Sequence, residues 1–115
     1  MYKVQVNEKM KRTVSKLVGV SFNNRQKNCA ELEPGFRLFW KHEADNQYDS
    51  NAVLCYSDPA MTKEIGHLSR DMAKDFVSRM KEGYKQEIFV LQTTGGMANK
   101  TYGVNIEIKE EEPEL

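Results

Sequence analysis

The sequence predicts a mainly β fold, a small barrel or sandwich of short strands with one clear helix. Several short apolar or alternating runs are separated by residues typical of turns, and only one segment has apolar residues at helical spacing. The chain has 115 residues, of which 39% are apolar and 30% charged. This size and composition are typical of one folded domain, and the chain contains no internal repeat or linker.

The N-terminal part has the weakest pattern. Residues 1–13 are mostly polar and charged apart from a short Val-Gln-Val run, and residues 1–15 are predicted to form an arm or an edge strand. Over residues 13–22 the alternation of Val18 and Val20 predicts a strand. The next residues, 23–28, form a polar run that predicts a loop.

Turn signals such as Pro-Gly and Gly-Gly separate the remaining strands. Five of these strands are predicted, at residues 36–43, 52–56, 65–68, 87–92 and 102–109. With the strand over residues 13–22 they make a total of about six short strands.

One helix is predicted between Ser69 and Gly83. Ser69 is a favourable N-cap, Asp71 places a negative charge in the first turn, and Gly83 suits the position after the C-cap. The apolar stripe that would face the core consists of Ala73, Phe76, Val77 and Met80.

The formal net charge is zero, with 17 basic and 17 acidic residues. Residues 110–115 hold four acids and no base, and they predict a disordered acidic tail. The remainder has 17 basic against 13 acidic residues, enough to hold a phosphate backbone locally. There is no apolar run of about 18 residues and no secretory signal, so we expect a cytoplasmic protein that does not enter a membrane.

The two cysteines favour no metal centre. Cys29, His42, Cys55 and His67 are too evenly spaced for a zinc site, whose ligands usually come in close pairs. We therefore expect buried free thiols and no cofactor.

The most informative segment is residues 45–53, Asp-Asn-Gln-Tyr-Asp-Ser-Asn-Ala-Val, directly before a predicted core strand. Tyr48 offers a flat face to a base, Asp49 can accept a hydrogen bond from a sugar hydroxyl, and Asn46 can do either. The alternative is an Asx turn, in which the same polar side chains bind the backbone. The chemistry of the residues leaves both alternatives open.

This segment and the later run Ile-Gly-His-Leu-Ser-Arg at residues 65–70 together resemble the HIRAN domain family. The family hallmark is Asn-Pro-Tyr-Asp-x-Asn-Ala, then a strand, then Ile/Val-Gly-His/Tyr-Leu opening a helix. The resemblance covers residues 16–109 and implies a barrel akin to an oligonucleotide-binding (OB) fold with one or two packed helices. It also implies a module that grips the free 3′-hydroxyl end of single-stranded DNA. Such modules occur in Snf-type DNA translocases that remodel stalled forks, and as stand-alone proteins of bacteria and phages.

By position, the resemblance implies roles for three residues of the loop. Tyr48 would stack on the terminal base, Asp49 would accept a hydrogen bond from the 3′-hydroxyl, and Asn46 would fix the terminal nucleotide. Gln47 replaces the usual proline, which loosens the loop but removes no ligand group.

Four further residues are implied from outside the loop. His67 would donate to a phosphate or a base, although it could equally be a satisfied, partly buried histidine. Arg70 would meet a phosphate at the start of a helix, or lie on the surface without a ligand. Phe22 would flank the end pocket, and Tyr102 is the candidate for the aromatic residue of the last hairpin. Ser21 stands where the family has an arginine, so one phosphate contact is missing.

Two classes of function remain. The first is a nucleic-acid-binding module without catalysis, whose partners would be single-stranded DNA and, in DNA repair, a helicase, translocase or nuclease. The alternative is a protein-interaction or phage accessory module that keeps the fold and has lost the DNA site. An enzyme is disfavoured because the sequence has no Gly-rich phosphate loop, nucleophile elbow or HExxH motif.

Overall fold

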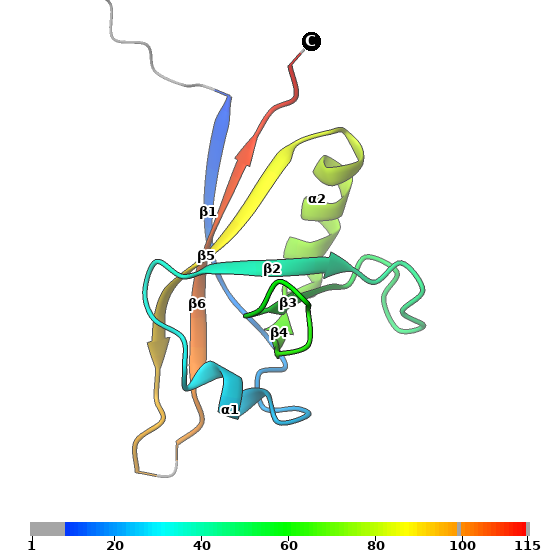
Figure 1. Cartoon of the computed structure of the whole chain (residues 1–115). Helices are drawn as coiled ribbons and strands as arrows, with labels where there is room; N and C mark the ends of the chain where they lie inside the picture. The colour runs from blue at the N-terminus through cyan, green and yellow to red at the C-terminus, as the bar shows by residue number, and fades with distance from the viewer. Residues whose placement is uncertain (1–8, 99, 115) are drawn as a thin grey trace, which may run out of the picture.

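The computed structural model describes residues 9–98 and 100–114. These residues form six strands and two helices, joined into one sheet of strand order β1-β6-β5-β2-β3-β4 (Figure 1). Every neighbouring pair of strands is antiparallel. In chain order the elements are β1 (Met10–Lys16), α1 (Arg25–Cys29), β2 (Arg37–His42), β3 (Val53–Tyr56), β4 (Glu64–His67), α2 (Arg70–Lys81), β5 (Lys85–Thr94) and β6 (Gly103–Glu111).

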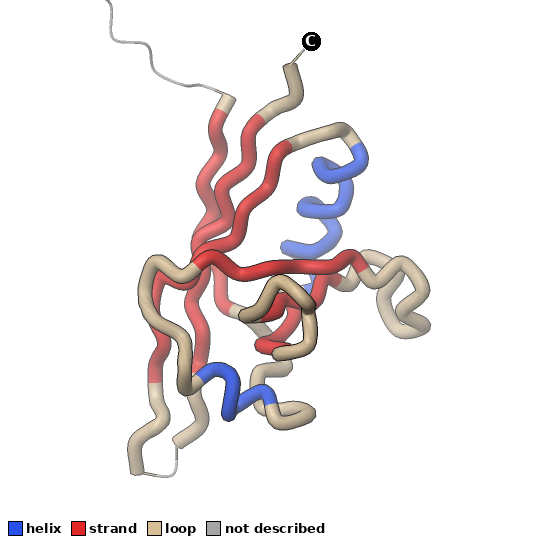
Figure 2. The backbone as a smooth tube through the Cα atoms, in the orientation of Figure 1, coloured by secondary structure: helices blue, strands red, loops and turns tan. Residues whose placement is uncertain are grey.

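The sheet curls into a half-barrel. β1, β6 and β5 run side by side, and β2 crosses them on its way to β3 and β4 (Figures 1 and 2). Beyond β1 the chain meets β4, where Val18 and His67 exchange two backbone hydrogen bonds of 2.8 and 2.9 Å. We call this pair the seam, because it joins the two ends of the strand order. The expected mainly β, barrel-like fold is confirmed.

The core lies between the curled sheet and α2. Trp40 of β2 meets Phe76 of α2 edge-on, with ring centroids 4.7 Å apart and an interplanar angle of 83°. Strand β3 is buried along its whole length, as its uninterrupted apolar sequence predicts. The largest side chains with almost no exposed surface include Leu17, Leu38, Ile65, Phe76, Ile88, Ile106 and Ile108.

Helix α2 begins and ends where its sequence predicts. Ser69 occupies the N-cap, although its side chain makes no capping hydrogen bond. At the other end Gly83 adopts a φ of +92°, which glycine tolerates without strain. The N–H groups of Gly83 and Tyr84 donate to the carbonyl oxygens of Met80 and Arg79, at 3.0 and 3.1 Å. This pattern is a Schellman motif, which satisfies the last carbonyls of the helix.

The N-terminal expectations need two corrections. The predicted strand over residues 13–22 ends at Lys16, because Gly19 has a φ of +67° and turns the chain. Most of α1 lies within the predicted loop at residues 23–28, and this helix follows Asn23 and Asn24, which have φ values of 50° and 64°. Asparagine tolerates this left-handed conformation, so the two residues redirect the chain into a short helix. The Val-Gln-Val run, on which the expected arm or edge strand depended, lies in residues 1–8, outside the described part, and β1 begins only at Met10.

The acidic tail expected at residues 110–115 also needs a correction, because β6 continues into its first two residues. Glu110 and Glu111 belong to β6, and only 1% of Glu110 is exposed. Its Oε2 accepts hydrogen bonds from Arg79 Nε and Gln86 Nε2, both at 2.8 Å. The alternation of β6 points this carboxylate inward, and the guanidinium of Arg79 compensates for its buried charge.

Candidate nucleic-acid interface

A cavity of about 510 Å³ lies at the seam. Four segments form its walls: the turn after β1, the start of α1, the loop between β2 and β3, and the junction of β4 with α2. Six of the seven site residues expected from the sequence lie in its walls, namely Phe22, Asn46, Tyr48, Asp49, His67 and Arg70. These residues lie up to 48 positions apart in the sequence, and the fold brings them around one hollow.

The loop between β2 and β3 holds its shape through its own side chains. Asn46 Oδ1 accepts hydrogen bonds from the backbone N–H groups of Tyr48 and Asp49, at 2.9 and 3.1 Å. Asn46 Nδ2 donates to Glu43 Oε1 at 3.3 Å. Asp49 Oδ1 accepts from the N–H of Asn51 at 2.9 Å, whereas Asp49 Oδ2 has no hydrogen bond within the described residues. The Asx turn considered for this loop is therefore present, and it fixes one carboxylate oxygen while leaving the other open.

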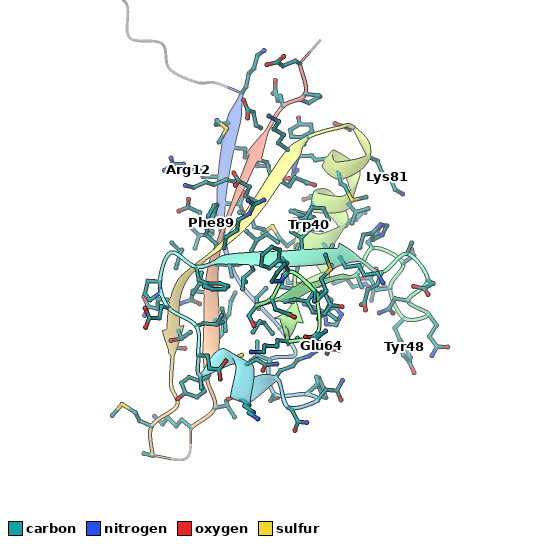
Figure 3. The ribbon with its side chains drawn as sticks, in the orientation of Figure 1. Arg12, Trp40, Tyr48, Glu64, Lys81 and Phe89 are labelled. Carbon is teal, nitrogen blue, oxygen red and sulfur yellow. The ribbon has the colours of Figure 1, made fainter. Side chains whose placement is uncertain are left out.

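Two exposed aromatic side chains border the cavity. Tyr48 is 84% exposed and Phe22 is 64% exposed. Tyr48 stands out from the loop after β2 (Figure 3). Phe22 lies over Gly19, where an added Cβ would come within 3.4 Å of the ring. Large exposed rings beside one hollow offer stacking surfaces, because a flat base that packs on an aromatic face buries apolar area on both rings.

His67 lies in the cavity wall with both ring nitrogens engaged. Its Nε2 lies 2.7 Å from Glu43 Oε1 and its Nδ1 lies 3.4 Å from Arg25 Nη1. The arrangement fits the tautomer in which Nε2–H donates to the carboxylate and Nδ1 accepts from the guanidinium. The geometry thus matches the satisfied, partly buried histidine rather than a side chain free to donate to a ligand.

Gly66 explains how β4 reaches the seam. A Cβ at this position would lie 2.9 Å from the carbonyl oxygen of Val18 and 2.9 Å from Val20 Cγ1. No other residue type leaves room for the chain after β1 to cross here, because such distances are shorter than real Cβ contacts. The glycine therefore sets the position of His67 against Val18.

Arg25 lines the cavity as well, although no sequence motif indicates it. It is 5% exposed, and its Nε and Nη2 lie 3.0 and 2.9 Å from Glu64 Oε1. Its Nη1 donates to the carbonyl oxygen of Gly19 at 2.8 Å. Figure 3 shows Glu64 beside α1, from which Arg25 extends. The sequence signal was faint: two asparagines before a short polar run, without the long periodicity that marks a helix.

Arg70 and Tyr102 differ in their placement. Arg70 is the first residue of α2, is exposed, and lies in the cavity wall. Tyr102 is half-buried, packs against the core, and has its backbone N–H and C=O bound to the side-chain amide of Gln26 at 2.6 and 3.1 Å. Its ring lies against Gly96 in the β5–β6 hairpin, so the structure does not bring it into the cavity.

The thiols lie away from this chemistry. Cys29 and Cys55 are buried and free, and burial raises their pKa to about 11 and about 12. Within the described ranges no group of three or more His, Cys, Asp or Glu side chains could hold a metal ion. Neither described helix is long and apolar enough to span a bilayer.

The curled half-barrel and its cavity define a small binding domain with an open, aromatic-edged hollow. The family model of the HIRAN domain matches residues 10–111, and the chain therefore belongs to the HIRAN domain family. This family is known as a nucleic-acid-binding module.

Two solved structures share the fold. A crystal structure of a Lactobacillus plantarum protein superposes with a TM-score of 0.64 at 16% identity, covering 89% of this chain and 99% of that one. The HIRAN domain of human HLTF superposes with a TM-score of 0.62 at 17% identity, covering 88% of this chain and 77% of that one. No curated protein matches the sequence.

Proposed function

We propose that this domain binds the 3′-hydroxyl end of single-stranded DNA in the cavity and catalyses no reaction. The observation that carries the proposal is the open carboxylate oxygen of Asp49, which borders the same hollow as two exposed aromatic rings and an exposed arginine. A terminal nucleotide offers matching groups: a flat base, a hydroxyl donor and a phosphate.

The base is assigned to the rings of Tyr48 and Phe22. Stacking of a base on an aromatic side chain contributes about 1–3 kcal/mol and is indifferent to base identity. With 84% and 64% of their surfaces exposed, both rings have area left for a base to cover.

The end group is assigned to Asp49. Its Oδ1 is fixed by the N–H of Asn51, so Oδ2 is held in place before a ligand arrives. A 3′-hydroxyl can donate to this oxygen, whereas a 3′-phosphate would place like charges together. Asp49 would thereby select a free end. Asn46 acts indirectly here, because its Oδ1 already shapes the loop.

The phosphate is assigned to Arg70. The guanidinium of Arg25 is neutralised by Glu64, which leaves Arg70 as the exposed cation of the wall. With few cations in contact, the affinity should depend only weakly on salt.

The test is a fluorescence-anisotropy titration of a short oligothymidine that ends in a 3′-hydroxyl or a 3′-phosphate. Wild type is expected to prefer the hydroxyl. Asp49→Asn keeps the acceptor for the N–H of Asn51 and removes the charge, so it should lose most of that preference while remaining folded. Asp45→Asn is the matched control, because Asp45 is exposed in the same loop and does not line the cavity.

Equal affinity of wild type for the two ends would refute end recognition and leave a general strand-binding groove. No binding to either oligonucleotide would favour a protein-interaction module on the same fold.

A further inference from the structure

A second hollow lies along the first turns of α2, beside the cavity at the seam, which we call the end cavity. The volume of the second hollow is about 550 Å³. The loop over residues 46–51 forms one side, and Arg70, Asp71 and Lys74 form the other. We call it the exit groove. It shares Asn46, Tyr48, Asp49 and Arg70 with the end cavity, so the two hollows meet around these residues.

The exit groove has the chemistry of a phosphate site rather than of a base site. Apart from Tyr48, its walls are amide, hydroxyl and charged side chains, which give a base no surface on which to stack. Arg70 and Lys74 are four residues apart on α2 and therefore neighbours on the helix surface. Both are exposed, and neither forms an ion pair within the part of the chain that the structure describes. Asp71 and the shared Asp49 are the two acids of the groove, so its formal charge is balanced and any phosphate contact has to come from Arg70 or Lys74 individually.

The two cations occupy different positions relative to the end cavity. Arg70 lines both hollows, whereas Lys74 lines only the exit groove. Four residues of helix rise span roughly 6 Å along the axis of α2. A strand that leaves the cavity through this groove therefore passes Arg70 first and Lys74 second.

We propose that the exit groove binds the sugar-phosphate backbone next to the strand end, with Arg70 on the first linkage from the 3′ terminus and Lys74 on the second. This inference rests on the proposed function, because it supplies the path of a strand whose end lies in the cavity. It names Lys74 as a residue that sets the length of strand recognised and the direction in which that strand leaves.

The test neutralises one phosphate at a time. Oligothymidines with a methylphosphonate at the first, second or third linkage from the 3′ end are titrated against wild type, Arg70→Ala, Lys74→Ala and Lys81→Ala. Lys81 is the matched control, because it is an exposed lysine at the far end of α2 (Figure 3). A neutral linkage should weaken wild type at the first and second positions and have little effect at the third.

Each variant should lose its response to a neutral linkage at one position, and we call this response (the fall in affinity caused by the methylphosphonate) the coupling. Arg70→Ala should no longer respond to the first methylphosphonate and Lys74→Ala should no longer respond to the second, while Lys81→Ala responds to both. Each lost contact should also lower the slope of log affinity against log salt by about 0.7, which makes the fall in affinity from 50 to 200 mM salt roughly 2.6-fold smaller.

A Lys74→Ala variant that keeps its full response to the second methylphosphonate would overturn the exit path. The end site is read out separately, by the ratio of affinities for 3′-hydroxyl and 3′-phosphate oligonucleotides. If that ratio stays high in wild type and Lys74→Ala while the coupling is absent, the proposed phosphate path is refuted and the proposed 3′-hydroxyl site is retained. If wild type shows no ratio or no binding, the end site fails and the path with it.

Discussion

Replacing Arg25 with methionine tests whether the wall of the cavity depends on a buried guanidinium. Arg25 is 5% exposed, its hydrogen bonds reach Glu64 and the carbonyl oxygen of Gly19 at 2.8–3.0 Å, and its Nη1 also lies 3.4 Å from His67 Nδ1. Methionine fills a similar volume without a donor, so the variant isolates the polar contacts from packing.

The magnitude follows from the partners that lose a donor. A hydrogen bond to a charged group contributes about 1.5–3 kcal/mol, and the pair of bonds to Glu64 counts once because both end on one oxygen. The side chain of Glu64 is 35% exposed, so solvent screens this interaction and its free-energy contribution falls at the lower end of that range. Taking about 1.5 kcal/mol for Glu64 and adding about 1 kcal/mol for the Gly19 carbonyl gives an expected loss of about 2–3 kcal/mol.

Urea unfolding followed by the fluorescence of Trp40, the one tryptophan, measures this loss. Arg37→Met is the control, because Arg37 is 61% exposed and lies 3.7 Å from Glu87, a geometry that contributes at most about 0.5 kcal/mol. An Arg25→Met variant that loses no more stability than Arg37→Met would refute a stabilising role for the buried guanidinium. Arg25→Lys keeps the charge but cannot reach Glu64 and Gly19 together, so it should recover less than half of the loss.

Two further outcomes follow from the packing of the core. Gly66→Ala should destabilise the fold by about 1–3 kcal/mol, because its Cβ would lie 2.9 Å from the Val18 carbonyl oxygen; unchanged urea unfolding would contradict this. Cys55 should remain unreactive to iodoacetamide at pH 8 in the folded protein, because burial raises its pKa to about 12 and keeps the thiol protonated until the pH approaches that value. Rapid native-state labelling of Cys55 at pH 8, measured by mass spectrometry, would show the burial to be wrong.

The sequence was informative wherever a periodic pattern ran long enough. The stripe of α2 and the alternation in β2, β5 and β6 located these elements to within a few residues. α1 spans five residues, which is too short for a helical period to appear, and its start depends on two asparagines in a left-handed conformation. Strand order could not be predicted, since β1 pairs with β6 through contacts such as Arg12 with Lys109, far apart in the chain.

The lining of the cavity could be predicted from the sequence only where its residues lie in short local motifs. The loop of Asn46, Tyr48 and Asp49 and the later His67 form compact motifs, and the fold brings them to one cavity. Arg25 was missed because its role comes from Glu64, which lies 39 positions away. When the role of a side chain depends on a partner far away in the sequence, the neighbouring residues give no pattern from which that role can be predicted.

The seam has a consequence for what the cavity can accept. β5 and β6 are joined along nine paired positions, whereas among the described residues the backbone hydrogen bonds between the two ends of the curled sheet are those of the Val18–His67 pair. Breaking two backbone hydrogen bonds costs about 1–3 kcal/mol, far less than parting a ladder. Arg25 holds the same seam through Gly19 and Glu64, so the backbone pair and the guanidinium have to let go together before the cavity wall can open. Under the proposed function, a strand end would therefore enter a hollow whose shape is already set.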